Sequence, residues 1–237
     1  MKHLIQSFKM FVSQIWRDDM LIAVCIAPLL AALFFRFGIP AVEHLLCVYY
    51  DKKAILADYY LLFDLFLSIL TPYMVCFASS MVLLTEYDEN MSQYMAVTPV
   101  GKKGYFVSRL IFPALISFLA SVLLMLCFTL TEWPVPMLIT VCFLSVLTSI
   151  AVSLLLFSFS HNRVEGMAVA KMAGLIMLGL PVPFFLISNA QYLFSVLPSF
   201  WIAKLCLEDS YWFLVPASIT SAIWIWLIYG KFKKKLS

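Results

Sequence analysis

Long apolar runs separated by short polar stretches make up most of this chain. A bilayer-spanning helix needs about 20 mostly apolar residues, because ~30 Å of hydrocarbon is crossed at about 1.5 Å per residue. Six runs have that length: residues 20–37, 60–84, 105–130, 136–159, 167–187 and 211–229. They are continuously apolar, whereas strands of a membrane barrel alternate in segments of about 10 residues. The pattern predicts an all-α integral membrane protein with six transmembrane helices in one domain, 1–237.

Residues 1–18 carry a different pattern, in which apolar side chains recur at helical spacing. The apolar set is Leu4, Ile5, Phe8, Phe11, Val12, Ile15 and Trp16. This spacing predicts an amphipathic helix lying flat in the membrane interface, with Trp16 at the headgroup level. The alternative is an amphipathic helix packed on protein. Asp18 and Asp19 are expected to cap the first spanning helix.

Proline and glycine divide the rest of the chain. Gly38 and Pro40 are expected to end the first span, which leaves 43–58 as an outward loop. The fifth span breaks at Pro181-Val-Pro183, and the following stretch, 182–209, is apolar but interrupted. We expect 182–209 to form short helices folded back as an outward re-entrant hairpin before the last helix.

Composition and charge agree with this layout. The chain is 64% hydrophobic with 12% charged residues, against about 25% charged in soluble domains. Placing the N-terminus, the 85–104 and 160–171 loops and the C-terminus on one side gives that side 12 of the 16 Lys and Arg residues. The positive-inside rule then predicts cytoplasmic termini in the cell membrane. The net charge of +3 comes mostly from this topology signal. Contact of the basic tail KFKKKLS with anionic lipid is a sufficient role for that charge, and no nucleic-acid partner is expected.

The longest polar stretch inside the membrane pattern begins at Glu86. Four side chains share one helical face: Tyr87, Met91, Tyr94 and Met95. Acidic residues, Glu86, Asp88 and Glu89, would occupy its first turn, where the helix dipole favours anions. Thr98-Pro99 would end it. We expect a cytoplasmic coupling helix at 86–100 whose Tyr/Met face fits a groove on a partner, with Glu86 and Glu89 facing water. The alternative is a solvated loop with incidental periodicity.

Candidate chemistry inside the membrane is sparse. Arg36 and Asp64 lie near the outer ends of sequential spans, so we predict an intramembrane ion pair; the alternative is that each reaches the outer headgroups. Gly174 and Gly179 have phosphate-loop spacing, but Leu180 replaces the required lysine. No HExxH or Gly-x-Ser-x-Gly motif occurs.

The chain is therefore not expected to be an enzyme, and it has no predicted catalytic, metal or cofactor site. The six cysteines are scattered without a CxxC motif, which is typical of buried free thiols. Cys47 and Cys206 both fall in outward segments, so a pairing between them stays open.

The order of these elements resembles the membrane subunits of type-2 ATP-binding-cassette (ABC) exporters. The opening RDDMLIAVCIAPLLAALFFRFGIPAVEHLL is similar to small fluoroquinolone-type drug export permeases. The local motif is Glu86 with Thr98-Pro99-Val100 and Arg109. Many members have a glycine shortly after the acidic pair, where this chain has Asn90, and that leaves the register of the coupling helix open.

The resemblance implies a separate ATPase subunit that binds ATP and magnesium and docks on Glu86, Glu89, Tyr87 and Met91. It also implies a second permease subunit, identical or different, with a pathway lined by the first, second and fifth spans. The cargo would be an amphipathic or hydrophobic drug, peptide or lipid that moves outward. Two other classes remain: a non-transporting scaffold or immunity protein, and a proton-coupled carrier that depends on Asp64.

Overall fold

The computed structural model describes residues 2–89, 104–105 and 107–236, and all regular structure in these ranges is helical. Seven long or medium helices are α1 (Lys2–Trp16), α2 (Asp19–Leu33), α3 (Ile39–Tyr50), α4 (Tyr60–Asp88), α7 (Phe112–Phe128), α8 (Val135–Phe159) and α12 (Leu214–Leu236). Shorter pieces are η1 (Phe34–Gly38), η2 (Ala57–Tyr59), η3 (Val107–Ile111), α9 (Arg163–Ala173), η4 (Gly174–Gly179), α10 (Val182–Phe185), η5 (Asn189–Val196), α11 (Pro198–Leu207) and η6 (Tyr211–Phe213).

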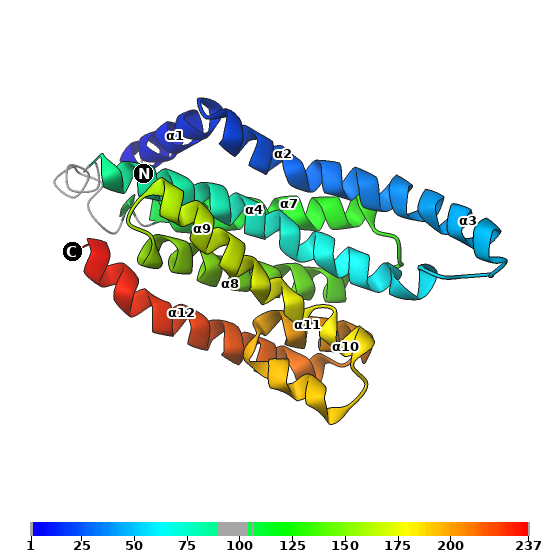
Figure 1. The fold of residues 1–237 in the computed structure, drawn as a ribbon. Coiled ribbons are helices and arrows are strands. Elements are labelled where there is room, and N and C mark those ends of the chain that lie inside the picture. The colour runs from blue at the N-terminus through cyan, green and yellow to red at the C-terminus, as the bar shows by residue number, and fades with distance from the viewer. Residues whose placement is uncertain (1, 90–103, 106, 237) are drawn as a thin grey trace.

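Helix α4 is the centre of the bundle. It packs against α2, α7, α8 and α9, and α8 in turn packs against α12. Both chain termini lie at one end of the bundle, which we call the terminal end; α4 finishes there, and the opposite end is the far end (Figure 1). Because every residue from 60 to 87 is buried or half-buried, α4 is a core helix with little outward surface.

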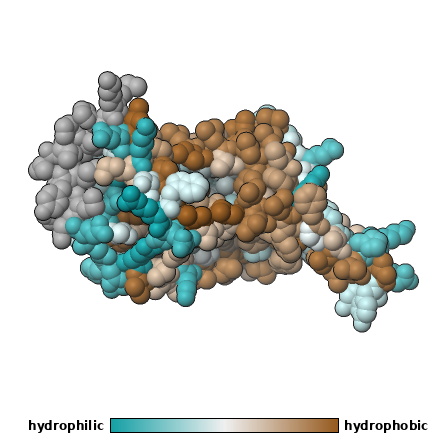
Figure 2. All heavy atoms as spheres, turned by 90° about the horizontal axis from the view of Figure 1, so that it is seen from above, coloured by the Kyte–Doolittle hydropathy of each residue, from teal (hydrophilic) through white to brown (hydrophobic). Residues whose placement is uncertain are grey.

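Among the residues that the structure describes, five helical stretches are long and apolar enough to cross a membrane: Asp19–Tyr50, Ala57–Asp88, Val107–Phe128, Val135–Phe159 and Tyr211–Lys235. A broad hydrophobic band covers the middle of the molecule, with hydrophilic side chains gathered toward its two ends (Figure 2). The expectation of an all-α membrane protein is thereby confirmed.

The predicted span 167–187 is divided among α9, η4 and α10, which follow one another along the bundle (Figure 1). Eleven α-helical and six 3₁₀ residues extend roughly 28 Å at about 1.5 and 2.0 Å per residue. That length is close to the bilayer core, so a six-span count stays a prediction that depends on this composite segment.

The first span is longer than expected, and the prediction of a loop over 43–58 is wrong for its first part. Helix α2 continues through the π-helical turn η1 into α3, which ends at Tyr50, with Asp51 in the left-handed conformation. Pro40 lacks an N–H and is normally a helix breaker. Here it occupies the first turn of α3, just after the wider turn η1, which lets the helix pass the proline.

Helix α1 matches its predicted span, and its apolar face is shared between protein and surface. Phe11 is buried, and Phe8, Val12 and Ile15 pack on the same core, while Trp16 is 71% exposed. The helix therefore packs on protein along much of its apolar face, as the alternative interpretation had it, and leaves Trp16 for the interface.

The capping prediction is confirmed for Asp18, whose carboxylate accepts the backbone N–H of Leu21 at 3.2 Å. Asp18 also pairs with Arg163 at the start of α9. Burial raises the pKa of Asp18, but the hydrogen bond from Arg163 and those from the helix backbone outweigh burial and hold it below its usual value.

The segment 182–209 folds as short helices, with α11 starting at Pro198. Gly179 of η4 lies directly against the start of α11, where a side chain would have no room. A Cβ at Gly179 would lie 2.7 Å from the backbone nitrogen of Phe200 and against the Ser199 hydroxyl, whereas Gly230 on α12 has nothing within 4 Å.

We predict that Gly179→Ala destabilises the fold by about 1–3 kcal/mol, because the added methyl group overpacks a backbone contact. Gly230→Ala is the matched control and should be neutral or stabilising by up to ~1 kcal/mol, since alanine favours a helix interior. Unfolding in detergent by SDS titration measures both. Equal stabilities of the two variants would contradict the close approach of η4 and α11.

Candidate functional site

A buried ion pair lies at the terminal end, where α4 finishes and η3 begins. The Arg109 guanidinium contacts the Glu86 carboxylate through Nη2 at 2.6 Å and through Nε at 3.0 and 3.1 Å. The Tyr105 hydroxyl donates to the same carboxylate at 2.8 Å. Glu86 and Arg109 are each 1% exposed, so the charges are neutralised by each other rather than by water.

The other side of the guanidinium holds α1. Its Nη1 donates to the backbone carbonyl of Ser7 at 2.7 Å, and the group lies over the Phe11 ring at 5.4 Å. We call Ser7, Phe11, Glu86, Tyr105 and Arg109 the arginine cluster. It connects α1, α4 and η3 through one planar cation, a geometry that lysine does not reproduce.

The cluster is strongly desolvated. Burial, followed by the neighbouring Glu86 carboxylate, raises the pKa of Tyr105 far above its usual range. Tyr105 therefore stays a neutral donor to Glu86 at all physiological pH values.

The expectation that Glu86 faces water at the start of a new helix is wrong. Glu86 belongs to the last turn of α4 and is buried, because Arg109 supplies a partner inside the protein. Glu89 fits the expectation: it is exposed and follows the end of α4. In the sequence, the signal that Arg109 is the partner of Glu86 was that both belong to the motif shared with the exporter family.

Tyr87 also points inward. Its ring packs edge-on against Phe157 of α8 with centroids 5.8 Å apart, so the expected Tyr/Met docking face loses its first member. The remaining predicted coupling residues, Met91, Thr98 and Pro99, lie outside the described residues.

The far end is organised by Asp64. Its carboxylate accepts the backbone N–H groups of Leu130 (2.8 Å) and Thr131 (3.0 Å), the Thr131 hydroxyl (2.6 Å) and the Trp133 indole N–H (3.0 Å). Arg36 donates instead to the carbonyl of Thr129 at 2.6 Å. Arg36 and Asp64 therefore bind the same turn, 129–133, and the predicted direct ion pair is not formed, because the turn's own donors satisfy the carboxylate.

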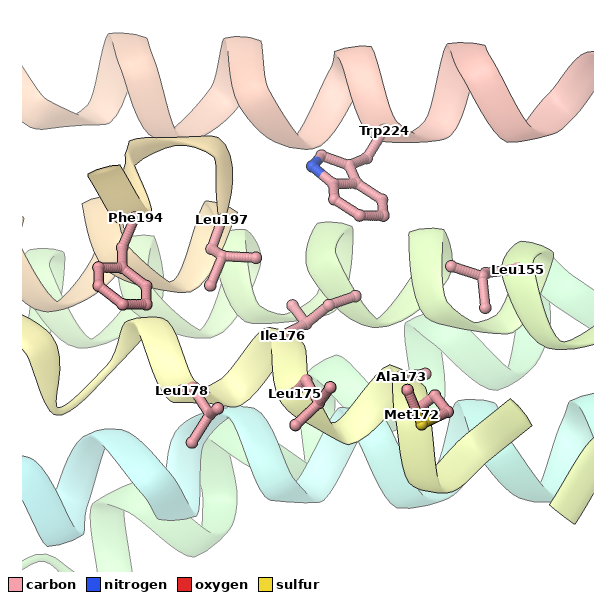
Figure 3. Close-up of a pocket in the computed structure, with 9 residues that line it drawn as sticks. All are labelled: Leu155, Met172, Ala173, Leu175, Ile176, Leu178, Phe194, Leu197 and Trp224. Atoms are coloured by element: carbon pink, nitrogen blue, oxygen red, sulfur yellow. The ribbon is translucent and has the colours of Figure 1, made fainter. Parts of the chain in front are cut away.

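An apolar groove runs along the outside of the bundle between α8, α9–η4, η5 and α12. Its cavity of about 370 Å³ is lined by Leu155, Met172, Ala173, Leu175, Ile176, Leu178, Phe194, Leu197 and Trp224 (Figure 3). A second hollow of about 410 Å³ shares Leu155 and Trp224 and continues along α8 and α12. The Trp224 indole N–H donates to the carbonyl of Val196 at 2.9 Å, so the ring adds apolar surface without an unpaired donor.

Disulfide bonds and metal-binding clusters do not occur among the described residues. All six cysteines are free thiols, Cys47 and Cys206 included. Within the described ranges, no group of three or more His, Cys, Asp or Glu side chains is placed to hold a metal ion.

For the arginine cluster we predict that Arg109→Ala lowers the free energy of unfolding by roughly 3–5 kcal/mol, because Glu86 is left buried without a partner. Arg17→Ala is the matched control: Arg17 is exposed at the same end, and its loss should change stability by less than ~0.5 kcal/mol. SDS titration in detergent provides the comparison, and similar losses in both variants would show that the pair is not buried.

For the far end we predict that Asp64→Asn costs about 1–3 kcal/mol, because an amide cannot accept from all four donors. Arg36→Ala should cost less than ~1 kcal/mol, since it removes one exposed hydrogen bond. Equal losses that fail to add in the double variant would instead indicate a direct Arg36–Asp64 ion pair.

Comparisons with known proteins support the resemblance to drug export permeases. The family model described as "Fluoroquinolones export permease protein Rv2686c-like" matches residues 11–230. The curated Fluoroquinolones export permease proteins Rv2686c and MT2760, from Mycobacterium tuberculosis strains H37Rv and CDC 1551, are each 26% identical over 228 residues. The alignment covers 93% of this chain and 90% of each relative.

No solved structure matches the chain significantly. The family match nevertheless extends from α1 to the last turns of α12 and includes both Glu86 and Arg109. The chain belongs to the Rv2686c-like family of fluoroquinolone export permeases.

Proposed function

We propose that this chain is the transmembrane subunit of an ATP-driven ABC exporter that moves an amphipathic or hydrophobic drug outward across the cell membrane. The observation that carries the proposal is the arginine cluster. Glu86 lies just before residues 90–103, while Tyr105 and Arg109 lie just after them, and all three meet in one buried contact. Both ends of the polar segment are therefore fixed to one point of the bundle.

Such an anchor suits a segment that receives force from a soluble partner. A segment attached to a rigid base passes displacement to the helices, whereas one on loose ends would absorb it. The partner is a separate ATPase subunit that binds ATP and magnesium, and this chain hydrolyses no ATP itself. Glu89 is exposed and immediately precedes this segment. Among the described residues, it is our candidate for docking the ATPase.

A second permease subunit, identical or related, completes the pathway. The first and fifth predicted spans remain its candidate walls, because α2 is largely uncovered and Leu175 and Leu178 of η4 are about half exposed. The second span does not suit this role, since α4 is buried by its own chain. The names of the relatives make a fluoroquinolone a candidate cargo, and the apolar groove would hold its apolar part.

Orientation follows from charge. Both termini lie at one end of the bundle (Figure 1), and most Lys and Arg residues belong to the segments at that end, which we place in the cytoplasm. A proton-coupled carrier fits less well, because the Asp64 carboxylate is occupied by four hydrogen bonds in a turn.

The proposal is tested by purifying the tagged chain in mild detergent and identifying what accompanies it by mass spectrometry. We expect a stoichiometric ATPase, with recovery lowered about tenfold by Glu89→Lys, equivalent to ~1.4 kcal/mol of binding. Glu132→Lys makes the same charge change at an exposed far-end site and should leave recovery unchanged.

Absence of any ATPase from the wild-type preparation would overturn the proposal and favour a scaffold or a carrier. Drug uptake into inverted vesicles, measured with ATP and with a pH gradient alone, separates those two classes.

A further inference from the structure

The last turn of α4 is held from two sides by two consecutive residues. Successive side chains of a helix point about 100° apart. Glu86 and Tyr87 therefore face different neighbours. Glu86 turns toward the arginine cluster, and Tyr87 turns toward Phe157 of α8. The first contact ties α4 to α1 and η3, and the second ties it to the other half of the chain.

Lys235 completes the second contact from the C-terminal tail. Its ammonium group donates to the carbonyl of Phe157 at 2.6 Å and also to the carbonyl of Ser160. The last carbonyls of a helix lack intrahelical partners and carry the negative end of its dipole. Lys235 therefore caps α8 with a cation.

The same ammonium group lies over two aromatic rings, at 4.6 Å from the centre of Tyr87 and 4.4 Å from that of Phe157. These distances are within the range of cation–π attraction, which strengthens when water is excluded. Phe157 is fully buried, and Phe232 packs on it with ring centres 5.1 Å apart.

The tail is thus more than a cluster of charges that contacts lipid. Phe232 is 3% exposed and belongs to the main core cluster, and Lys235 is inserted between the ends of α4 and α8. Lys233, by contrast, is exposed on the same helical turns. A topology signal needs only charge, whereas Lys235 has a specific set of partners.

We infer that Lys235 is a positioning residue for coupling: with Tyr87 it forms a clamp that passes a displacement of the end of α4 to α8 and α12. These two helices carry Leu155 and Trp224, which line both hollows of the apolar groove. Trp224 and Lys235 are eleven residues apart on α12, or roughly 16 Å along the axis. The inference rests on the proposed ATP-driven export.

Three variants test the clamp. Lys235→Met keeps the apolar stem and removes the charge and donors, while Lys235→Arg keeps a cation that stacks on rings and donates. Lys233→Met is the matched control. Hydrogen exchange of the permease alone, read on peptides covering 84–89 and 155–160, reports whether the two helix ends are held together.

We expect Lys235→Met to raise exchange at 84–89 and 155–160 about tenfold, as local opening becomes easier. Lys235→Arg should restore protection, and Lys233→Met should match wild type. Unchanged exchange in Lys235→Met would overturn the clamp, whether or not an ATPase partner exists.

The coupling role is read from the complex with its ATPase, reconstituted in liposomes with a fluorescent fluoroquinolone as the probe. Drug moved per ATP hydrolysed should fall about tenfold in Lys235→Met, the effect of a barrier change of ~1.4 kcal/mol, while ATPase recovery stays unchanged. A coupling ratio equal to wild type, despite raised exchange, would reduce Lys235 to a structural cap and overturn the inference.

Discussion

Burial of the Glu86–Arg109 pair is the constraint on which the terminal end depends. Neither charge reaches water, so each is tolerated only while the other is in place. The pair joins two residues that are 23 positions apart in the sequence, and the same guanidinium also binds α1 through Ser7. The guanidinium therefore holds α1, the end of α4 and η3 together as one unit. A polar segment between two membrane helices acquires a fixed base in this way without a large hydrophobic interface of its own.

Helix α4 repeats this arrangement at its other end with different chemistry. Asp64 receives four hydrogen bonds from the turn after α7, while Glu86 receives a guanidinium and a phenol. The two acids are 22 residues apart, which is roughly 33 Å of helix at about 1.5 Å per residue and close to the thickness of the hydrocarbon layer. A carboxylate near each end lets one buried helix organise the connections on both sides, and the helix as a whole packs against neighbours that include α2, α7, α8 and α9.

The sequence was informative where a signal was local. Run length predicted the five helices that are long enough to span a membrane, helical spacing predicted α1, and Pro181 and Pro183 predicted the break after η4. The sequence was misleading where the structure of a residue depends on a partner that is distant in the chain. Pro40 indicated a helix end, but the wider turn η1 carries the helix past it. Glu86 resembled the first turn of a soluble helix because the residues around it are polar. Its burial depends on Arg109, 23 positions away, and no local pattern shows which side chains meet across the intervening segment.

In the function we propose, the lining of the apolar groove limits how one cargo is distinguished from another. Its lining is apolar, and the indole N–H of Trp224 is already used by Val196. Apolar walls separate ligands by one methylene for only about 1–3 kcal/mol, whereas unpaired polar groups in a site reject wrong ligands far more strongly. Such a groove would select cargo by shape and by partition into the bilayer, because the residues that line its first hollow are apolar. A charged group on the proposed cargo would then have to stay in the headgroup region or meet the proposed second subunit. Strict chemical selectivity would therefore require polar residues that the lining of the first hollow does not contain.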